Sequence, residues 1–403
     1  MAIEKPVTIL AISSYHKGHD FLKEAKRQGA RVLFLTSQSL QDAEWPRESI
    51  DEIYFMPDNK KEWYMPDVIK AVSFLARKEK LDKIVALDDF DVEKAASIRE
   101  HLRIPGMGES QARFFRDKLA MRMRAKDAGI PVPEFIGVFN HDDLNKFASV
   151  VPFPFMVKPR MQAGSIGMKK VNSPMEMWDV INAAAEMQSF YLVERFIPGI
   201  VCHVDTIMYE GKVKFVVASE YGLPPLEVAH QGRVFTSRNV LRDTELESEL
   251  FTLNEKVLSS LGLQTGVSHT EFIKAADGSL YFLETSARVG GAHISDLVEA
   301  ATGVNLWAEW AKIESLPKGK KYSAPKSKKN YAALLNSLAK QQWPDMSGYN
   351  APEVFLKMNR EYHVGLILQS NKYEKISEYL ETYTNRFYND FFTFVPMADK
   401  PTN

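Results

Sequence analysis

The segment YFLETSARVGGAHI, residues 281–294, ends an aromatic-rich, strand-like run with Glu284. A second strand-like run, GVSHTEFIKA, precedes it and carries Glu271, and the dipeptide Asp-Gly at 277–278 between the two runs is a strong β-hairpin signal. The two glutamates lie about six positions on either side of this turn, so an antiparallel hairpin places them nearly opposite each other on one face. Two opposed carboxylates repel each other unless a cation lies between them. Mg2+, a hard cation that takes carboxylate oxygens and keeps positions open for phosphates, fits this pair.

The residues that follow Glu284 complete a site for phosphoryl chemistry. Ser286 adds an oxygen ligand, and Arg288 lies two residues further on the same side, where a guanidinium stabilises the charge of a transferring phosphoryl group. Gly290 and Gly291 let backbone N–H groups approach an anionic substrate. The alternative is an ordinary hairpin with a glutamate on its solvent face, which the apolar neighbours of both glutamates disfavour. The predicted metal ligands are Glu271, Glu284 and Ser286, and the predicted catalytic and substrate-binding arginine is Arg288.

The composition of the whole chain is that of an ordinary globular enzyme. Its 403 residues, 45% hydrophobic and 26% charged, are enough for two or three packed units. Lysine and arginine number 51 against 52 aspartate and glutamate, so no net charge indicates a nucleic-acid partner. The single cysteine, Cys202, excludes an intramolecular disulfide and a cysteine-based zinc site. The first apolar run is too short for a signal sequence or a membrane span, so we expect a cytoplasmic protein with no membrane partner.

Strand-like and helix-like segments alternate in the first quarter of the chain. The strand-like runs VTILAIS, RVLFLTS and DKIVALD are separated by amphipathic, helix-like runs. This order predicts a parallel α/β sheet with right-handed crossovers. SSYHKGHD follows the first strand where a dinucleotide-binding protein has G-x-G-x-x-G, so that fingerprint is absent.

The acidic run DDFDVE, residues 88–93, lies where the third of these strands meets its helix. Ligands of parallel sheets bind at the carboxyl ends of the strands, so these carboxylates are candidates to bind an amine. The alternative, which we favour, is that one aspartate caps the helix and the others interact with its positive end. Capping is the commoner use of aspartate at such a junction.

A lysine and a glycine-containing loop occur together near the middle of the chain. Lys158 ends the apolar run FPFMVK, where burying a lysine is costly unless it meets an anion. The loop AGSIG follows at 163–167, and its small residues let backbone N–H groups form an anion cradle. The pair predicts a phosphate site, with a plain hairpin turn as the alternative, and it is no P-loop because the lysine precedes the glycines. The predicted nucleotide-binding residues here are Lys158, Gly164, Ser165 and Gly167.

Taken in order, these motifs resemble the ATP-grasp superfamily, and within it the carboxylate–amine ligases of the biotin-carboxylase-like branch, which include L-amino-acid ligases. The segments that carry the resemblance are RDKLAMRMRAKDAGIPVPEF, VKPRMQAGSIGMKKV, LVERFIPG, HTEF and LETSARVGGAHI. The resemblance implies an α/β and α+β fold in four parts. These are a pre-ATP-grasp parallel α/β domain at 1–114, an ATP-grasp core at 115–312 with a lid subdomain near 151–192, a lysine-rich linker at 313–330, and a C-terminal α+β segment at 331–403.

The resemblance also implies roles for residues outside the hairpin. Lys118 and Lys158 are implied to contact ATP phosphates, and residues 194–197 to bind adenine as the interdomain hinge. His203 corresponds to a nucleotide-ribose contact, with an ordinary strand histidine as an equal alternative, and His230 lies in a segment near the carboxylate substrate or in a plain surface loop. The implied nucleotide-binding residues are Lys118, Lys158, Glu194, Arg195, Phe196, Ile197 and His203, and the implied substrate-binding residues are Arg288, Gly290, Gly291, His293 and His230.

Two positions depart from the family pattern. Ser286 stands where the family usually has asparagine, which weakens the expectation of a third metal ligand. Ala292 stands where biotin carboxylases have a glutamate that acts as the base for bicarbonate, so the resemblance points away from bicarbonate chemistry and towards the amino-acid ligases.

The activity that the resemblance implies is an ATP-dependent ligation that uses ATP and Mg2+ (or Mn2+). A carboxylate is activated as an acyl phosphate and then joined to an amine, with release of ADP and phosphate. The expected partners are therefore small-molecule carboxylates and amines, and a homodimer is compatible with the resemblance because related ligases are often dimers. The alternatives are an ATP-grasp enzyme that acts on a nucleotide precursor and a non-catalytic ATP-binding protein.

Overall fold

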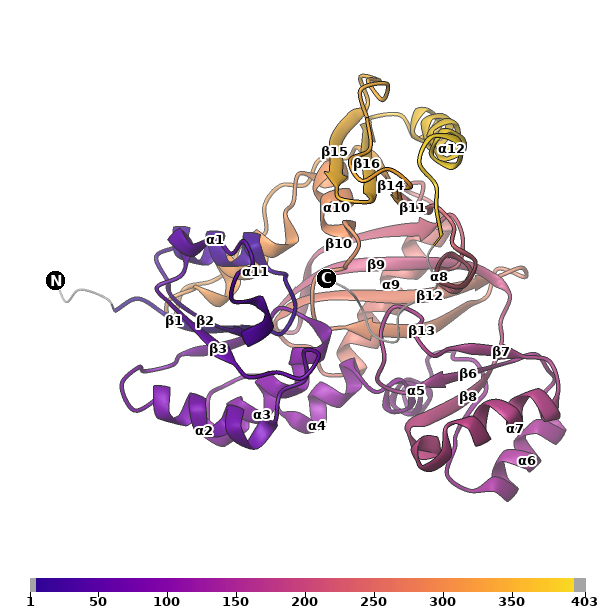
Figure 1. Cartoon of the computed structure of the whole chain (residues 1–403), viewed down its shortest axis with the longest axis horizontal. Helices are drawn as coiled ribbons and strands as arrows, with labels where there is room; N and C mark the ends of the chain where they lie inside the picture. Colours follow the sequence, from indigo (N-terminus) through magenta and orange to yellow (C-terminus); the bar gives the residue numbers. More distant parts are fainter. Residues whose placement is uncertain (1–4, 395–403) are drawn as a thin grey trace.

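The computed structural model describes residues 5–394, which form three β-sheets with helices packed on them (Figure 1). The N-terminal domain holds the first sheet, whose order β3-β2-β1-β4 is parallel throughout, as predicted. Strand β3 was not predicted, because it is an edge strand whose residues are mostly half-buried or exposed. The elements are β1 (Thr8–Ser13), α1 (His19–Arg27), β2 (Arg31–Ser37), β3 (Glu52–Met56), α2 (Met65–Leu75), β4 (Lys83–Ala86), α3 (Val92–Leu102) and α4 (Glu109–Ala112).

The second sheet is small and antiparallel, with the order β5-β8-β6-β7, and lies at the lower right of Figure 1. Its apolar side chains form a hydrophobic cluster of their own. The lid expected at 151–192 leaves out β5, α6 and most of β8, because the three-residue β5 shows no readable periodicity. The elements of this region are α5 (Lys118–Asp127), β5 (Phe135–Gly137), α6 (His141–Val150), β6 (Phe155–Pro159), β7 (Lys169–Val171), α7 (Pro174–Ala183) and β8 (Tyr191–Arg195).

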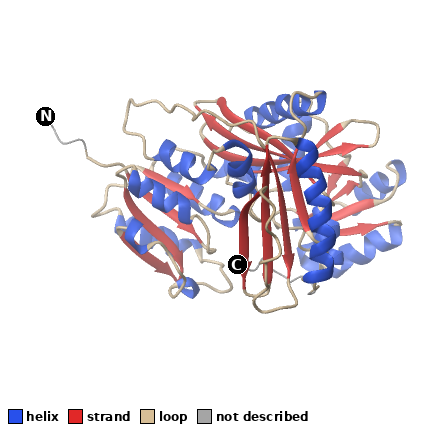
Figure 2. Ribbon diagram, turned by 90° about the horizontal axis from the view of Figure 1, so that it is seen from above, coloured by secondary structure: helices blue, strands red, loops and turns tan. Residues whose placement is uncertain are grey.

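The third sheet is antiparallel and has eight strands in the order β13-β12-β9-β10-β11-β14-β16-β15. Figure 2 shows red strands through the middle of the molecule with blue helices beside them. Tight hairpins connect β9 to β10 at Glu210-Gly211 and β12 to β13 at Asp277-Gly278, and the second of them was predicted. The C-terminal α+β segment does not form a sheet of its own, because β14 pairs with β11 of the core. The elements are β9 (Gly199–Tyr209), β10 (Lys212–Tyr221), α8 (Pro225–Gln231), β11 (Phe235–Asn239), α9 (Glu245–Ser260), β12 (Gly266–Ala275), β13 (Leu280–Ser286), α10 (Ile294–Thr302), α11 (Leu306–Glu314), β14 (Tyr331–Leu338), β15 (Val354–Arg360), β16 (His363–Ser370) and α12 (Tyr373–Asp390).

The N-terminal domain and the large sheet share one hydrophobic core. Buried side chains of β1, α1 and β2 belong to the same cluster as those of β9, α10, α11 and β14. Phe21 of α1 meets Trp310 of α11 edge-on, with ring centroids 5.3 Å apart. The lysine-rich segment between α11 and β14 has no helix or strand, and its six lysines are exposed. Among the described residues, no helix has the length and apolar character needed to cross a membrane.

Candidate active site

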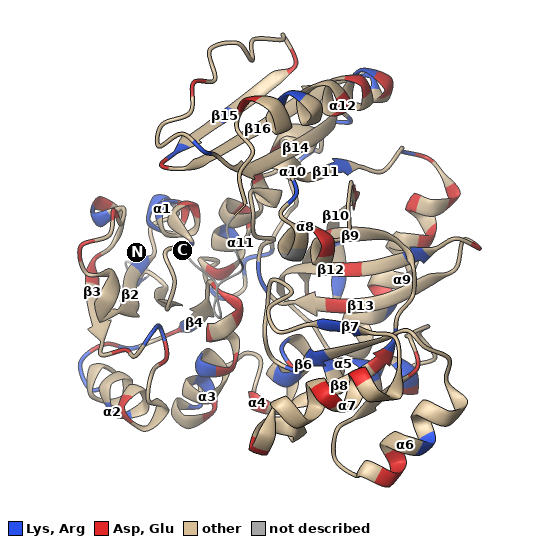
Figure 3. Cartoon of the chain, turned by 45° about the vertical axis from the view of Figure 1, so that its right-hand side comes forward, with Lys and Arg blue, Asp and Glu red and all other residues tan. Residues whose placement is uncertain are grey.

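A cavity of about 840 Å3 opens between the small sheet, the large sheet and the N-terminal domain. Its volume lies in the range of small-molecule sites, about 300–1,000 Å3. Basic segments of α5, β6 and β7 face acidic segments of β12 and β13 around it (Figure 3). The predicted residues at its wall are Lys118, Lys158, Gly164, Ser165, Glu194, Arg195, Phe196, Ile197, Glu271, Glu284, Ser286, Arg288 and Gly291.

Four predicted residues are not among those that line this cavity: Gly167, His203, Gly290 and His293. Gly167 and Gly290 are the neighbours of lining residues in the chain. His293 pairs with Asp296 at the start of α10, with 2.8 Å between Nδ1 and a carboxylate oxygen. His230 belongs to α8, and its side chain lies outside the described part of the structure.

The hairpin places the two predicted metal ligands directly opposite each other. Glu271 of β12 pairs with Glu284 of β13, as the count from the turn predicted, and His269 pairs with Ser286. The Tyr221 hydroxyl donates to Glu271 at 2.8 Å. Two carboxylates and a hydroxyl on one wall of the cavity are the oxygen donors that Mg2+ or Mn2+ prefers, so the residues fit such an ion.

Lys118, at the start of α5, contacts the metal-ligand pair. Its Nζ lies 2.9 Å from a carboxylate oxygen of Glu284 and donates to the Gln162 carbonyl at 2.6 Å. Burial works to raise the pKa of Glu284, but the neighbouring Lys118 and Lys158 outweigh it and hold that pKa below its usual value. Glu284 is therefore ionised at neutral pH and available to a cation.

Lys158, near the end of β6, belongs to a buried network of charged side chains. It forms an ion pair with Glu194 of β8, and Glu194 also accepts from Arg122 Nε at 3.0 Å. Burial lowers the pKa of Lys158 to about 8, although Glu194 acts in the opposite direction. The Glu194 side chain therefore has two cationic partners within the protein.

Arg288 forms an ion pair with Asp89 of the N-terminal domain. Its Nε donates to Asp89 Oδ2 at 2.7 Å, and Asp89 follows β4 in the acidic run DDFDVE. Burial would raise the pKa of Asp89, but Arg288 and Arg116 dominate and hold it well below its usual range. Asp89 is only 4% exposed, and its Oδ1 has no hydrogen-bond partner.

The other aspartates of this run have structural partners. Asp88 caps the short helical turn that follows it and forms an ion pair with Lys17. Asp91 accepts from the Ser14 backbone N–H at 2.7 Å and contacts Lys94 at 2.9 Å. The favoured interpretation, capping, therefore holds for Asp88, whereas Asp89 faces the cavity.

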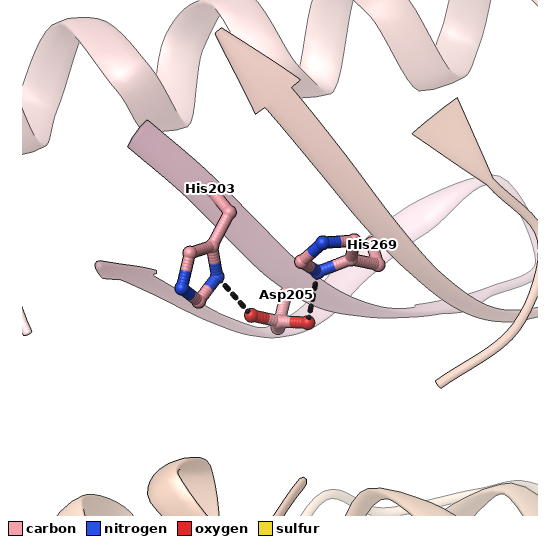
Figure 4. A group of neighbouring side chains, drawn as sticks. All are labelled: His203, Asp205 and His269. Carbon is pink, nitrogen blue, oxygen red and sulfur yellow. Dashed lines mark hydrogen bonds and ion pairs between the residues drawn. The ribbon is translucent and has the colours of Figure 1, made fainter. Parts of the chain in front are cut away.

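His203 is fully buried in a polar network next to the cavity (Figure 4). The carboxylate of Asp205 lies between two histidines. One of its oxygens is 2.8 Å from His203 Nδ1 and the other is 2.9 Å from His269 Nδ1. Burial lowers the pKa of His269, but Asp205 outweighs burial and raises it to about 9. His203 Nε2 contacts Ser237 at 2.8 Å, so both of its ring nitrogens have partners within the protein.

Three functional-site residues were missed or undervalued from the sequence: Asp89, Arg122 and Tyr221. Arg122 follows Lys118 by one helical turn, so helical spacing would have placed both on one face. Asp89 lay in a recognised acidic run, but no local signal distinguishes it from Asp88 and Asp91.

Comparisons with known proteins agree with this architecture. Residues 125–306 match the family model described as D-ala D-ala ligase C-terminus. An L-arginine-specific L-amino acid ligase of Bacillus subtilis is 26% identical over 234 residues, which cover 56% of this chain and 56% of that protein. A D-alanine–D-alanine ligase of Pseudomonas fluorescens is 26% identical over 247 residues, 57% of this chain and 72% of that protein. The chain thus spans little more than half the length of the first of these relatives.

Solved structures resemble nearly the whole chain. An L-amino acid ligase from Bacillus licheniformis superposes with a TM-score of 0.77 at 19% identity, covering 97% of this chain and 99% of the other. A carboxyaminoimidazole ribonucleotide synthase from Aspergillus clavatus, complexed with ATP, gives a TM-score of 0.73 at 13% identity, with 96% and 99% covered. These likenesses confirm the predicted ATP-grasp fold.

Proposed function

We propose that this chain, an ATP-grasp protein of the carboxylate–amine ligase branch, is an ATP-dependent ligase that forms an amide bond. A substrate carboxylate attacks the γ-phosphorus of ATP to give an acyl phosphate and ADP; an amine then displaces phosphate and loses a proton. The observation that carries the proposal is the convergence of two lysines, two paired glutamates and Arg288 on one cavity. Such a site offers cations for phosphates and oxygens for a metal.

The charged residues of the cavity would have different roles, set by the chemistry of their side chains. Glu271 and Glu284 would hold Mg2+ or Mn2+, with Ser286 beside them, and the ion would neutralise charge on the phosphate oxygens of ATP. Lys118 would exchange its contact with Glu284 for a phosphate. Arg288 would stabilise the charge that develops on the transferred phosphoryl group.

The small sheet would act as a lid over the nucleotide. It carries Lys158 and the loop with Gly164 and Ser165 at the cavity wall. Closure would exclude water, which otherwise hydrolyses an acyl phosphate. The backbone of residues 195–197, also at the wall, would bind adenine. We further propose a cytoplasmic enzyme with free small molecules as partners, for which a homodimer is compatible.

An α-amino acid is the substrate class that the cavity favours. An amino acid carries an ammonium group next to its carboxylate, and the cavity presents Asp89 beside Arg288. The partnerless Oδ1 of Asp89 is a buried acceptor for such an ammonium group. The names of two similar proteins, both L-amino acid ligases, agree with this class.

A substrate matrix tests the ligase. The purified chain with ATP and Mg2+ is incubated with pairs of amino acids, and ADP, phosphate and the amide product are quantified. We expect ADP release that requires both a carboxylate and an amine, and its loss in Lys158→Met. Failure of every pair, or ADP release with a nucleotide precursor alone, would contradict the ligase and favour one of the alternatives.

The role of Asp89 is tested in the same assay by comparing an amino acid with its des-amino carboxylate. Asp89→Asn should lower kcat/KM for the amino acid by roughly ten- to a hundredfold more than for the des-amino acid, as expected for loss of a charge-assisted hydrogen bond. Asp88→Asn is the matched control, because Asp88 does not line the cavity. Equal losses for both carboxylates would contradict the ammonium role without touching the ligase assignment.

A further inference from the structure

Two histidines and a backbone carbonyl converge at the edge of the N-terminal domain. His16 lies in the loop between β1 and α1, and His19 begins α1. Their Nε2 atoms are 3.0 Å apart. The carbonyl oxygen of Glu44 lies 3.4 Å from His16 Nε2 and 3.1 Å from His19 Nε2. Three atoms with lone pairs therefore form a nearly equilateral triangle.

One shared proton is the simplest metal-free account of this triangle. If His19 Nε2–H donates to both Glu44 O and His16 Nε2, one proton serves all three atoms. If both Nε2 atoms carry protons instead, two N–H groups face each other. With His19 Nε2–H as the donor, the lone pair of His16 Nε2 points into the triangle and accepts that proton.

A metal ion bound between the three atoms would accept a lone pair from each of them. Imidazole nitrogen and carbonyl oxygen ligands bind Zn2+ and similar ions at about 2.0–2.2 Å. Neighbouring ligand atoms are then about 2.8–3.1 Å apart in octahedral geometry and about 3.3–3.6 Å apart in tetrahedral geometry, an overall interval of about 2.8–3.6 Å. The observed sides of 3.0, 3.1 and 3.4 Å fall in that interval.

We propose that His16, His19 and the Glu44 carbonyl bind a late first-row transition-metal ion such as Zn2+, Co2+ or Ni2+, with water at the remaining positions. Imidazole is a ligand suited to these ions rather than to Mg2+. His16, His19 and Glu44 do not line the active-site cavity, so this ion is separate from the one proposed for ATP.

Trp45 holds the two rings in place. Its indole stacks on His19 at a centroid distance of 5.2 Å with 17° between planes, and meets His16 at 4.7 Å and 78°. Trp45 is buried, and its Nε1–H donates to the Leu40 carbonyl at 3.1 Å. The ligands are thus oriented before an ion arrives.

The second histidine cluster, drawn in Figure 4, does not offer such a site. His203 and His269 each direct Nδ1 at a different oxygen of Asp205, as the dashed lines show. Their Nε2 atoms contact Ser237 and Tyr221. Every imidazole nitrogen of that cluster is hydrogen-bonded, so a metal would have to displace a satisfied network.

The test is metal binding to the full-length chain without a histidine tag, with excess Mg2+ present to occupy oxygen-ligand sites. Co2+ alone is titrated, its visible absorption is followed, and Zn2+ is then added as a competitor. We expect one saturable site, and affinity lowered by more than about tenfold in both His16→Ala and His19→Ala, at least the loss that follows removal of an outer-shell partner. His363→Ala, at an exposed histidine of β16, should bind like the parent.

Thermal unfolding of each variant without metal confirms that the chain is folded. Saturable Co2+ binding that Zn2+ reverses and that both substitutions weaken supports the site. Absence of saturable binding would mean that the triangle is a hydrogen-bonded pair sharing a proton. Binding that survives either substitution would locate the ion elsewhere, and both results overturn the proposal.

Discussion

Charged side chains in the cavity form ion pairs with one another. Lys118 contacts Glu284, and Arg288 contacts Asp89. Unpaired charges of this kind are costly to bury, so each charge needs a partner until a ligand takes over. Under the proposed function, a nucleotide that brings phosphates and a metal would supply those replacement partners, so that binding would exchange ion pairs instead of creating them from free charges.

Substitutions of Glu284 and of Arg288 should therefore impair turnover in different ways. Glu284→Gln keeps an oxygen in place but removes charge, so the Mg2+ concentration needed for half-maximal turnover should rise, because metal affinity follows ligand charge. Arg288→Lys keeps the charge but loses the planar fork, so kcat should fall with little change in Mg2+ demand. Titrating Mg2+ against ADP release measures both effects.

Matched controls separate these effects from general damage. Glu255→Gln on α9 and Arg124→Lys on α5 make the same exchanges at exposed positions and should behave like the parent. An unchanged Mg2+ requirement in Glu284→Gln, or parental turnover in Arg288→Lys, would show that these roles are wrongly assigned.

Helix α5 connects two sheets through one side chain. Arg122 is fully buried, and its guanidinium donates to Glu194 of β8 and to the Leu283 carbonyl of β13. It also lies over the Phe282 ring at 5.7 Å. The helix therefore fixes the small sheet and the hairpin relative to each other, at the junction where the cavity opens.

Replacing Arg122 should destabilise the fold strongly. Arg122→Leu leaves Glu194 buried with only Lys158 as a partner, and breaking a buried ion pair costs about 3–5 kcal/mol. Urea denaturation of the variant measures this loss. Arg124→Leu, two residues away on the exposed side of the same helix, should change stability by no more than about 0.5 kcal/mol. Equal effects of the two substitutions would mean that Arg122 does not link the elements.

These elements also show where prediction from sequence ends. The pairing of Glu271 with Glu284 was predictable, because a tight turn fixes the register of both strands. The contact of Arg288 with Asp89 was not, because it joins residues 199 positions apart. Local periodicity identifies helices, strands and turns, whereas such partners are set by how complete elements pack. The pairing of β14 with β11 was likewise not predictable, because it joins strands from distant parts of the chain.

The folded chain has fewer independent packing units than the predicted domain boundaries indicate. The predicted boundaries at 114 and 312 both cross a single hydrophobic cluster, which contains Phe21 of the N-terminal domain, Val267 of the core and Leu334 of the C-terminal segment. The small sheet is different, since none of its strands contributes to this shared cluster and its own cluster draws only on its own elements. Cooperative units follow shared buried surface rather than position in the chain.

We therefore expect one main unfolding transition that includes the N-terminal domain, the large sheet and the C-terminal segment. Calorimetry should give this transition with agreement between the calorimetric and van't Hoff enthalpies, apart from the contribution of the small sheet. Amide hydrogen exchange should be faster in β6 and β7 than in β9 and β12, because the small sheet can open without disturbing the shared core. ATP with Mg2+ should slow exchange in β6 and β7 if that sheet closes over the nucleotide. A separate transition for residues before 114 would contradict the shared core, and exchange in β6 and β7 that nucleotide leaves unchanged would contradict the lid.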